Sequence, residues 1–188
     1  KFSEIEYIDV PEMNLNEYCN FLVKDLYKYF ETSHCLLIQE DSFVVNPNQW
    51  KQEYLNYDYI GAPWTKIIQP IKNKNIELKN RVGNGGFSLR SKNLLSACKD
   101  LDFNNLFKKY SMNNEDVIIC HYLYEDMVKK GIKFAPPELA ANFSMEHEPT
   151  ILDCGFNRDQ VFGFHGKHLA GYFKKKFIEK LKLEEIIK

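Results

Sequence analysis

Residues 35–41 read Cys-Leu-Leu-Ile-Gln-Glu-Asp, four apolar residues followed by three polar ones. A short continuous apolar run is typical of a strand that is buried on both faces in a parallel or mixed sheet, so we expect such a strand over Cys35–Gln39. The polar cluster Gln39-Glu40-Asp41 then stands at the carboxyl end of the strand, where open α/β sheets bind their ligands. This stretch predicts both the fold class and the position of a site.

Strands and helices alternate on either side of this run. An amphipathic helix begins at Asn14, with apolar residues spaced three and four apart, and a short strand is expected before it over Ile5–Val10. Further strands are expected over Tyr57–Ala62 and Phe87–Arg90, and a second long helix over Glu115–Lys129. The alternation predicts an α/β fold in which helices flank one mixed central sheet.

The composition fits one folded domain and excludes several functions. The length of 188 residues suits a single domain over 1–188. Twenty-five Lys and Arg against 26 Asp and Glu leave a net charge of −1, so no general basic field favours nucleic acid. No apolar run approaches the ~18 residues that a transmembrane helix needs. Residues 173–188 combine lysines with apolar residues, so this segment could contact a membrane surface peripherally. The more ordinary interpretation is a helix whose lysines face solvent and whose apolar residues pack against the core.

Two features concern the setting of the chain. Its five cysteines are odd in number and form no Cys-x-x-Cys pair, which predicts reduced thiols and a cytoplasmic location. The sequence starts at Lys1 rather than at methionine, which suggests a piece of a longer polypeptide.

Residues 83–86 read Gly-Asn-Gly-Gly, and three residues without Cβ atoms let a ligand or another backbone approach the main chain closely. A strand, not a helix, is expected next, which disfavours a dinucleotide-binding loop. An Asn-Gly hairpin turn is the simpler interpretation of these residues taken alone.

Further side chains could carry chemistry. Asp41 could bind a hard cation, which needs only one or two carboxylates when a diphosphate supplies other oxygens. Glu115 and Asp116 lie at the expected start of a helix, whose dipole favours the ionised form that a general base needs. His165, between a strand and a glycine, could bind a metal ion. Each of these residues also has a purely structural interpretation. Asp41 could simply end a strand at the surface, Glu115 and Asp116 could be ordinary acidic residues in the first turn of a helix, and His165 could be a packed histidine.

The order of the motifs is more specific than any one of them. The chain carries QED at 39–41, YDYIGAPW at 57–64, GNGGFSLRS at 83–91, NEDV at 114–117 and FGFHG at 162–166. In this order the motifs resemble a family of little-characterised glycosyltransferase-like domains, over roughly residues 17–166. More distantly, the chain is similar to the GT-A-type transferases related to fringe and the β-1,3-galactosyltransferases.

The resemblance implies a GT-A-like fold and a metal-dependent glycosyltransferase. The expected donor is a nucleotide-diphosphate sugar, in particular a UDP-sugar, and the acceptor is a hydroxyl of a glycan or protein. Asp41 and His165 would hold Mn²⁺ or Mg²⁺ against the diphosphate of the donor, with Gln39 beside them.

The resemblance also implies roles in the transfer itself. Asp116 would take the proton of the acceptor hydroxyl in an inverting displacement, with Glu115 next to it. Gly85 and Gly86 would let donor or acceptor lie against the backbone, and Trp64 would stack on a sugar face.

Two departures from the pattern keep other functions open. Gln39 replaces the first Asp of the usual Asp-x-Asp motif, and only one short strand is expected before the first long helix. The second departure suggests that the N-terminal nucleotide-binding strand of a GT-A-like domain is absent from this sequence. Both departures motivate an alternative, a catalytically inactive carbohydrate- or partner-binding domain of the same fold. A third interpretation is a metal-dependent phosphohydrolase that uses the same acidic strand end.

Overall fold

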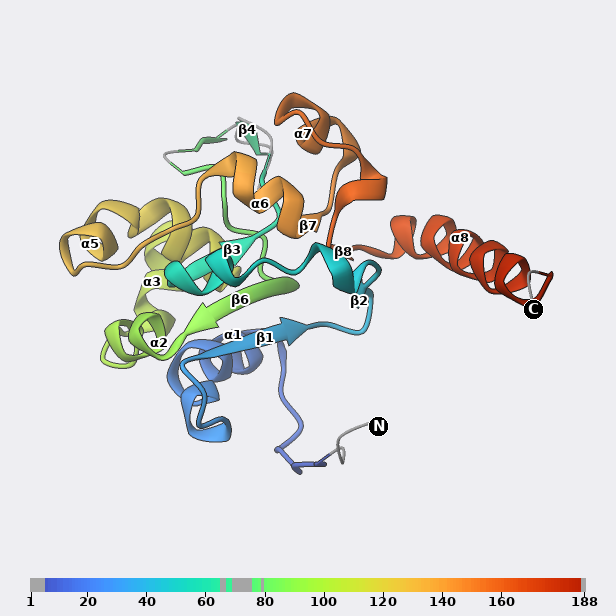
Figure 1. Ribbon diagram of the computed structural model, residues 1–188. Coiled ribbons are helices and arrows are strands. Elements are labelled where there is room, and N and C mark those ends of the chain that lie inside the picture. The colour runs from blue at the N-terminus through green and yellow to red at the C-terminus, as the bar shows by residue number, and fades with distance from the viewer. Residues whose placement is uncertain (1–5, 65–66, 69–75, 79, 187–188) are drawn as a thin grey trace.

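Helices surround small sheets in the computed structural model, which describes residues 6–64, 67–68, 76–78 and 80–186 (Figure 1). The helices are α1 (Leu15–Lys24), α2 (Lys92–Cys98), α3 (Phe103–Tyr110), α4 (Glu115–Val117), α5 (Tyr124–Lys129), α6 (Pro137–Phe143), α7 (Glu148–Asp153) and α8 (Lys167–Ile186). The strands are β1 (His34–Ile38), β2 (Ser42–Val44), β3 (Tyr59–Gly61), β4 (Ile67–Ile68), β5 (Ile76–Glu77), β6 (Phe87–Ser91), β7 (Ser144–Met145) and β8 (Gly163–His165). The expected α/β class is confirmed.

The strands are divided between sheets, so the expectation of one mixed central sheet is wrong. In the described residues, β6 pairs antiparallel with β1 and β3, β8 pairs antiparallel with β2 and parallel with β7, and β4 pairs with β5. The two three-stranded sheets meet at the carbonyl of Gly86, which accepts hydrogen bonds from the Gln39 N–H (2.9 Å) and the Ser42 hydroxyl (2.9 Å). The turn from β1 into β2 therefore places Asp41 where the sheets join.

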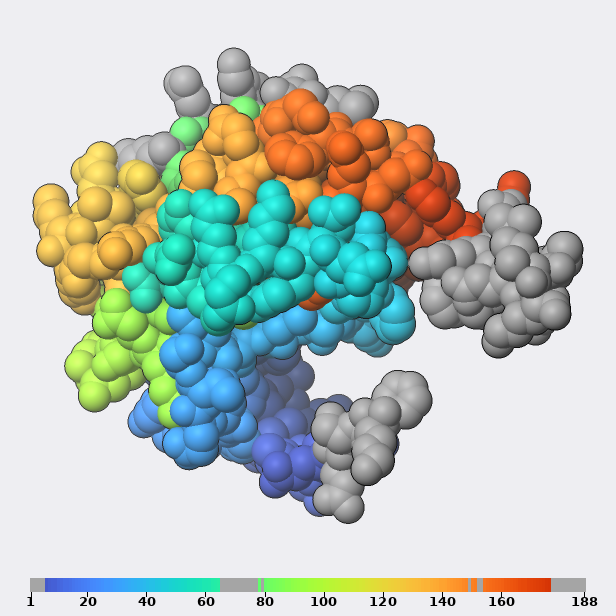
Figure 2. Space-filling model, viewed as in Figure 1, coloured from blue at the N-terminus to red at the C-terminus, as the bar shows by residue number. Residues whose placement is uncertain are grey.

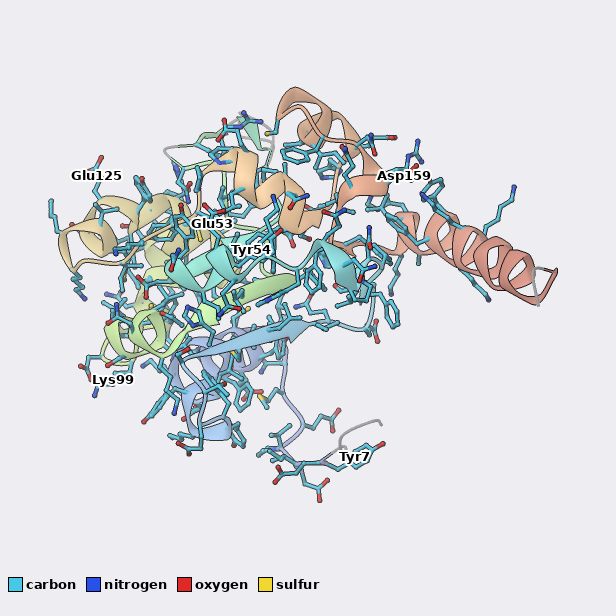
Figure 3. All side chains as sticks on the ribbon, viewed as in Figure 1. Tyr7, Glu53, Tyr54, Lys99, Glu125 and Asp159 are labelled. Atoms are coloured by element: carbon cyan, nitrogen blue, oxygen red, sulfur yellow. The ribbon has the colours of Figure 1, made fainter. Side chains whose placement is uncertain are left out.

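Side chains alternate between the two faces of the β1–β6–β3 sheet. On one face, Tyr59 packs with residues of α1 to α5. On the other face, Ile60, Phe87 and Leu89 pack with α6 and with an aromatic cluster around Tyr54. Tyr54, labelled in Figure 3, is fully buried. Its ring meets those of Trp50 and Phe143 edge to face. Helices and loops thus cover both faces of the sheet, as in other layered α/β folds.

The first helix forms where the sequence predicted it. The Asn14 Oδ1 accepts hydrogen bonds from the N–H groups of Asn16 and Glu17, and the Glu17 carboxylate accepts one from the Asn14 N–H (2.9 Å). This reciprocal cap satisfies backbone donors that the first turn leaves unpaired.

The first two predicted strands differ from the structure, one in its existence and the other in its burial. The strand expected over Ile5–Val10 is wrong for the described residues 6–10, which are in no strand. Tyr7 is 87% exposed and points away from the body (Figure 3). A lone strand is not stable without a pairing partner. β1 exists, but it lies at an edge of its sheet and its residues are half-buried or exposed, so the expected burial on both faces is wrong.

The second long helix is interrupted. α4 passes into a π-helical turn over Ile118–Tyr122, in which the Leu123 N–H donates to the Ile118 carbonyl (2.8 Å), and α5 follows. Asn114 stands at the start of α4, although its side chain makes no capping hydrogen bond. The predicted single helix over Glu115–Lys129 is therefore only partly confirmed. Such π-turns occur often at functional sites.

The C-terminal helix α8 extends outward from the body (Figure 1), and its first turns pack against the body (Figure 2). Phe173 stacks on Phe164 with ring centroids 4.8 Å apart, the Tyr172 hydroxyl donates to Asp159 (3.0 Å), and Lys176 pairs with the same carboxylate. The side chains from 177 onward, which include most of the predicted membrane-contacting residues, lie outside those described. In the described part of the chain, no helix is both long and apolar enough to cross a membrane. The structure places none of the five cysteines in a disulfide.

Candidate functional site

The loop Gly83–Gly86, just before β6, is where the predicted site residues meet. A Cβ atom on Gly86 would overlap the imidazole of His165. A Cβ atom on Gly85 would lie 3.0 Å from Arg90 Nη2 and 3.1 Å from Asp116 Oδ2. The groups that approach Gly83, Gly85 and Gly86 in the structure are side chains of the chain itself, so approach of a ligand to this loop stays a prediction.

Asp41 and His165 are brought together from distant parts of the sequence. Asp41 follows β1, His165 ends β8, and the pairing of β2 with β8 sets Ser42 opposite His165. The His165 Nε2 lies 3.4 Å from the Asp41 Oδ1, and the two side chains are 18% and 22% exposed. The Gly166 N–H donates to the Asp41 carbonyl (3.0 Å) and fixes the two chain segments against each other.

A second carboxylate, Glu146, lies on the other side of the same imidazole. Its Oε1 is 3.4 Å from the His165 Nδ1, and the amide Nδ2 of Asn84 is 3.0 Å from that nitrogen. The sequence reasoning did not find Glu146. Glu146 directly follows β7, so its place after a short strand was the available signal.

The pKa values in this cluster are shifted by burial and by charge. Burial alone would lower the pKa of His165, but the hydrogen bond and charge of Glu146 and the charge of Asp41 raise it above its usual value. Burial alone would raise the pKa of Glu146, but hydrogen bonds with His165 and Asn84 and the charge of His147 lower it. Both shifts favour a charged pair of Glu146 and His165.

A metal ion would have two protein donors here. Glu146 faces the other ring nitrogen, so only Asp41 and the His165 Nε2 could hold the same ion. Among the described residues, no group of three or more His, Cys, Asp or Glu side chains has the arrangement of a metal site. One carboxylate and one imidazole nevertheless fit a divalent ion such as Mn²⁺, because such ions keep waters and substrate phosphates in their coordination shell. Gln39, which stands two residues before Asp41, donates its amide to the Tyr18 hydroxyl (3.1 Å).

Asp116 lies close to Asp41, His165 and Glu146. It contacts Gly85, whereas His165 contacts the next residue, Gly86. Its Oδ2 accepts a hydrogen bond from the Gly85 N–H (2.8 Å), and its Oδ1 accepts one from the Val117 N–H (2.7 Å). Burial, with the charge of Glu115, raises the pKa of Asp116 to about 7, against the effect of these two hydrogen bonds. At neutral pH this carboxyl group is therefore poised between its two protonation states, as a general base or acid requires.

Glu115 has a different environment from its neighbour. Its Oε1 lies 2.8 Å from the Arg90 Nη2 in an ion pair whose side chains are 8% and 0% exposed. The Arg90 Nε donates to the Ser88 hydroxyl (3.0 Å), and the guanidinium lies over the Tyr59 ring. The catalytic role of Glu115 stays a prediction: its carboxylate pairs with Arg90 inside the protein and links α4 to β6.

The environment of Trp64 also differs from the one expected for a residue that stacks on a sugar. The ring is 6% exposed and packs in the core with Tyr59 and Cys120, beside Gly83. A sugar cannot stack on a ring that the core already covers, so the predicted role of Trp64 is corrected to packing.

The chain was compared with known proteins in three ways. Neither the curated proteins nor the solved structures gave a match. One family model matches residues 4–165, which include all the site residues described above. The chain therefore belongs to the family described as protein of unknown function (DUF5672).

Proposed function

We propose that this chain is a metal-dependent glycosyltransferase of GT-A-like architecture, which moves a sugar from a nucleotide-diphosphate sugar to a hydroxyl of a glycan or protein. One observation carries the proposal. Two adjacent residues, Gly85 and Gly86, contact the candidate base Asp116 and the candidate ligand His165, and the Asp41 carboxylate lies 3.4 Å from that imidazole. Metal donors and a base thus adjoin one loop.

Asp41 and His165 would bind the donor end of the reaction. When bound, the metal ion would neutralise the negative charge that develops on the departing nucleotide diphosphate. The turn between β1 and β2 presents the Asp41 carboxylate, and Gly86 leaves the space that the His165 ring occupies. Both side chains are partly exposed, so a ligand can reach them from solvent.

Asp116 would act on the acceptor. Two backbone N–H groups hold its carboxylate in place, and a carboxylate with two bonds accepted still has lone pairs for a hydroxyl proton. A pKa raised to about 7 makes it a stronger base than an ordinary aspartate while leaving a large ionised fraction at neutral pH. A single displacement assisted by this base would invert the anomeric centre.

A second candidate is a carbohydrate-binding domain without transferase activity. A hollow of about 600 Å³ lies between the N-terminal segment and α1. Its lining includes the amide side chains of Asn16, Asn20 and Asn104, the aromatic rings of Phe21 and Tyr29, and the charged side chains of Glu17, Lys24 and Asp25. Neutral amides and aromatic rings suit sugar hydroxyls and sugar faces, and Gln39 removes one acid from the usual metal motif.

A screen of donor hydrolysis separates these functions. The chain is incubated with Mn²⁺ and each of a panel of sugar nucleotides, and release of nucleotide diphosphate is measured. The transferase proposal expects release from at least one donor, with a strong loss in Asp116→Asn. Glycan binding without any release would favour the binding domain, and release of inorganic phosphate would favour the phosphohydrolase.

A further inference from the structure

Two consecutive carbonyl groups of the glycine loop each accept a hydrogen bond from a buried serine. The Ser88 hydroxyl donates to the Gly85 carbonyl (2.9 Å), and the Ser42 hydroxyl donates to the Gly86 carbonyl (2.9 Å). Both serines are buried, Ser88 completely. A glycine backbone has more conformations open to it than any other residue, so these two bonds restrict a loop that is intrinsically free to change shape.

Arg90 fixes the direction of the Ser88 hydroxyl. The Arg90 Nε donates to the Ser88 oxygen (3.0 Å), and a guanidinium has no acceptor. The hydroxyl therefore accepts from Arg90 and keeps its own proton for the Gly85 carbonyl, which can only accept. The Arg90 Nη2 lies 3.4 Å from the same carbonyl and supports it from a second direction.

The guanidinium of Arg90 also connects this strand to α4. Its Nη2 donates to the Glu115 Oε1 (2.8 Å). The remaining nitrogen, Nη1, is buried and has no hydrogen-bond partner among the described residues. Leaving a buried donor unpaired costs about 1–3 kcal/mol. The guanidinium is thus placed by its contacts with Ser88 and Glu115 and not by the pairing of all its donors.

The N–H of the same glycine faces the candidate base. The Gly85 N–H donates to the Asp116 Oδ2 (2.8 Å). A Cβ atom on Gly85 would lie 3.0 Å from the Arg90 Nη2 and 3.1 Å from the Asp116 Oδ2, so both side chains lie on one side of this residue. Any change in φ or ψ of Gly85 turns its N–H relative to its carbonyl. A carbonyl held by Ser88 therefore also determines where the N–H points.

We propose that Ser88 is a positioning residue for Asp116. Its hydroxyl holds the Gly85 carbonyl, which keeps the Gly85 N–H directed at the Oδ2 of the carboxylate. One oxygen of Asp116 is thereby fixed from the loop, while the Val117 N–H fixes the other (2.7 Å). The role in sugar transfer rests on the proposed function, whereas the direction of the Gly85 N–H does not.

A purely structural role for Ser88 makes a different prediction. If the hydroxyl only satisfies the buried Arg90, its loss lowers stability and leaves the Gly85 N–H in place. Ser91 provides the matched control, because it is a buried serine of the same strand. Its hydroxyl donates to Asp58 (2.6 Å) and accepts from the Leu94 N–H (2.9 Å), away from the glycine loop.

The resonance of the Gly85 amide, followed by ¹H–¹⁵N NMR at neutral pH, tests the geometry. A bond to a carboxylate shifts an amide proton downfield, and Asp116→Asn gives the position without that charge. Ser88→Ala is expected to move the Gly85 amide proton upfield, towards its position in Asp116→Asn, whereas Ser91→Ala should leave it unchanged. An unchanged resonance in Ser88→Ala, or an equal shift in Ser91→Ala, would overturn the proposal.

The kinetics of nucleotide diphosphate release test the consequence for the reaction. Ser88→Ala is expected to lower kcat on the order of 10²-fold, as when a reacting group is displaced by about 1 Å. The KM for the donor should change little, because Ser42 still holds the loop on the side of Asp41 and His165. Ser91→Ala should keep both constants. A Ser88→Ala variant whose amide resonance moves while kcat is unchanged would show that Ser88 does not position a base.

Two further outcomes are informative. Should Ser88→Ala fail to fold, Ser88→Cys has a side chain of similar size whose thiol is only a weak donor, and the same upfield shift is expected. A folded Ser88→Cys with an unchanged Gly85 resonance would contradict the proposal. If the amide responds as expected in Ser88→Ala but the wild type releases no nucleotide diphosphate from any donor, the positioning of Asp116 by Ser88 is supported and the proposed transferase function is contradicted.

Discussion

The imidazole of His165 occupies the space that a side chain at position 86 would need. A Cβ atom on Gly86 would overlap three atoms of the ring, so the glycine and the histidine require each other. This contact joins the start of β6 to the end of β8 and fixes His165 beside Asp41.

Gly86→Ala should therefore move the His165 ring out of its position. We expect Mn²⁺ affinity to fall at least about 10-fold, as when the support of a metal-bound histidine is lost, while the protein stays folded because the ring can turn into solvent. Isothermal titration with Mn²⁺ measures this. Gly171→Ala is the control, since a Cβ there meets nothing within 4 Å and its φ is not positive. Equal affinities in Gly86→Ala and wild type would show that His165 does not bind the ion.

The buried pair of Arg90 and Glu115 should be costly to break from one side. Arg90→Met leaves the Glu115 carboxylate buried without its partner, and we expect the free energy of unfolding to fall by about 3–5 kcal/mol. The double variant Arg90→Met, Glu115→Leu removes both charges and should recover most of that loss. Urea unfolding of the two variants is the measurement. A loss in the double variant as large as in Arg90→Met would argue against the ion pair.

Asp116 should make stability depend on pH. Burial and the charge of Glu115 raise its pKa from 3.8 to about 7, so the folded protein binds this proton more tightly than the unfolded chain does. The contribution of Asp116 to the free energy of unfolding is therefore largest below pH 3.8 and is lost as the pH rises through about 7. In Asp116→Asn this fall should be absent.

Thermal unfolding of wild type and Asp116→Asn across that pH range checks the prediction. Asp100→Asn, which changes an exposed carboxyl group, serves as the control and should follow wild type. A parallel pH dependence in wild type and Asp116→Asn would mean that the carboxyl group titrates normally.

The sequence predicted the elements whose signals are local. The α1 cap depends on Asn14 and Glu17, three residues apart, and β1 and β6 are each only five residues long. Elements that depend on distant partners were not predicted. The segment before α1 has the composition of a strand, but no described strand pairs with it. The π-turn at Ile118–Tyr122 leaves no mark in the apolar periodicity.

In the candidate site, too, residues next to local elements could be proposed from the sequence, whereas contacts between distant segments could not. Asp41, Asp116 and His165 could be proposed from the sequence because each follows or precedes a recognisable element. Glu146 was missed because its meeting with His165 depends on the parallel pairing of β7 with β8, which residues 144–146 do not reveal. The role expected for Trp64 came from the family resemblance alone, which does not reveal that the ring packs in the core beside Gly83.

The most direct test of the proposed site is the thermal unfolding midpoint in the presence of uridine diphosphate, with either Mn²⁺ or EDTA. A ligand that binds only the folded protein raises the midpoint. We predict that uridine diphosphate raises it with Mn²⁺ and not with EDTA, and that Asp41→Ala and His165→Ala abolish the rise while Glu40→Ala retains it. An equal rise with EDTA, or a rise that survives in both Asp41→Ala and His165→Ala, would contradict a metal-dependent nucleotide site at Asp41 and His165.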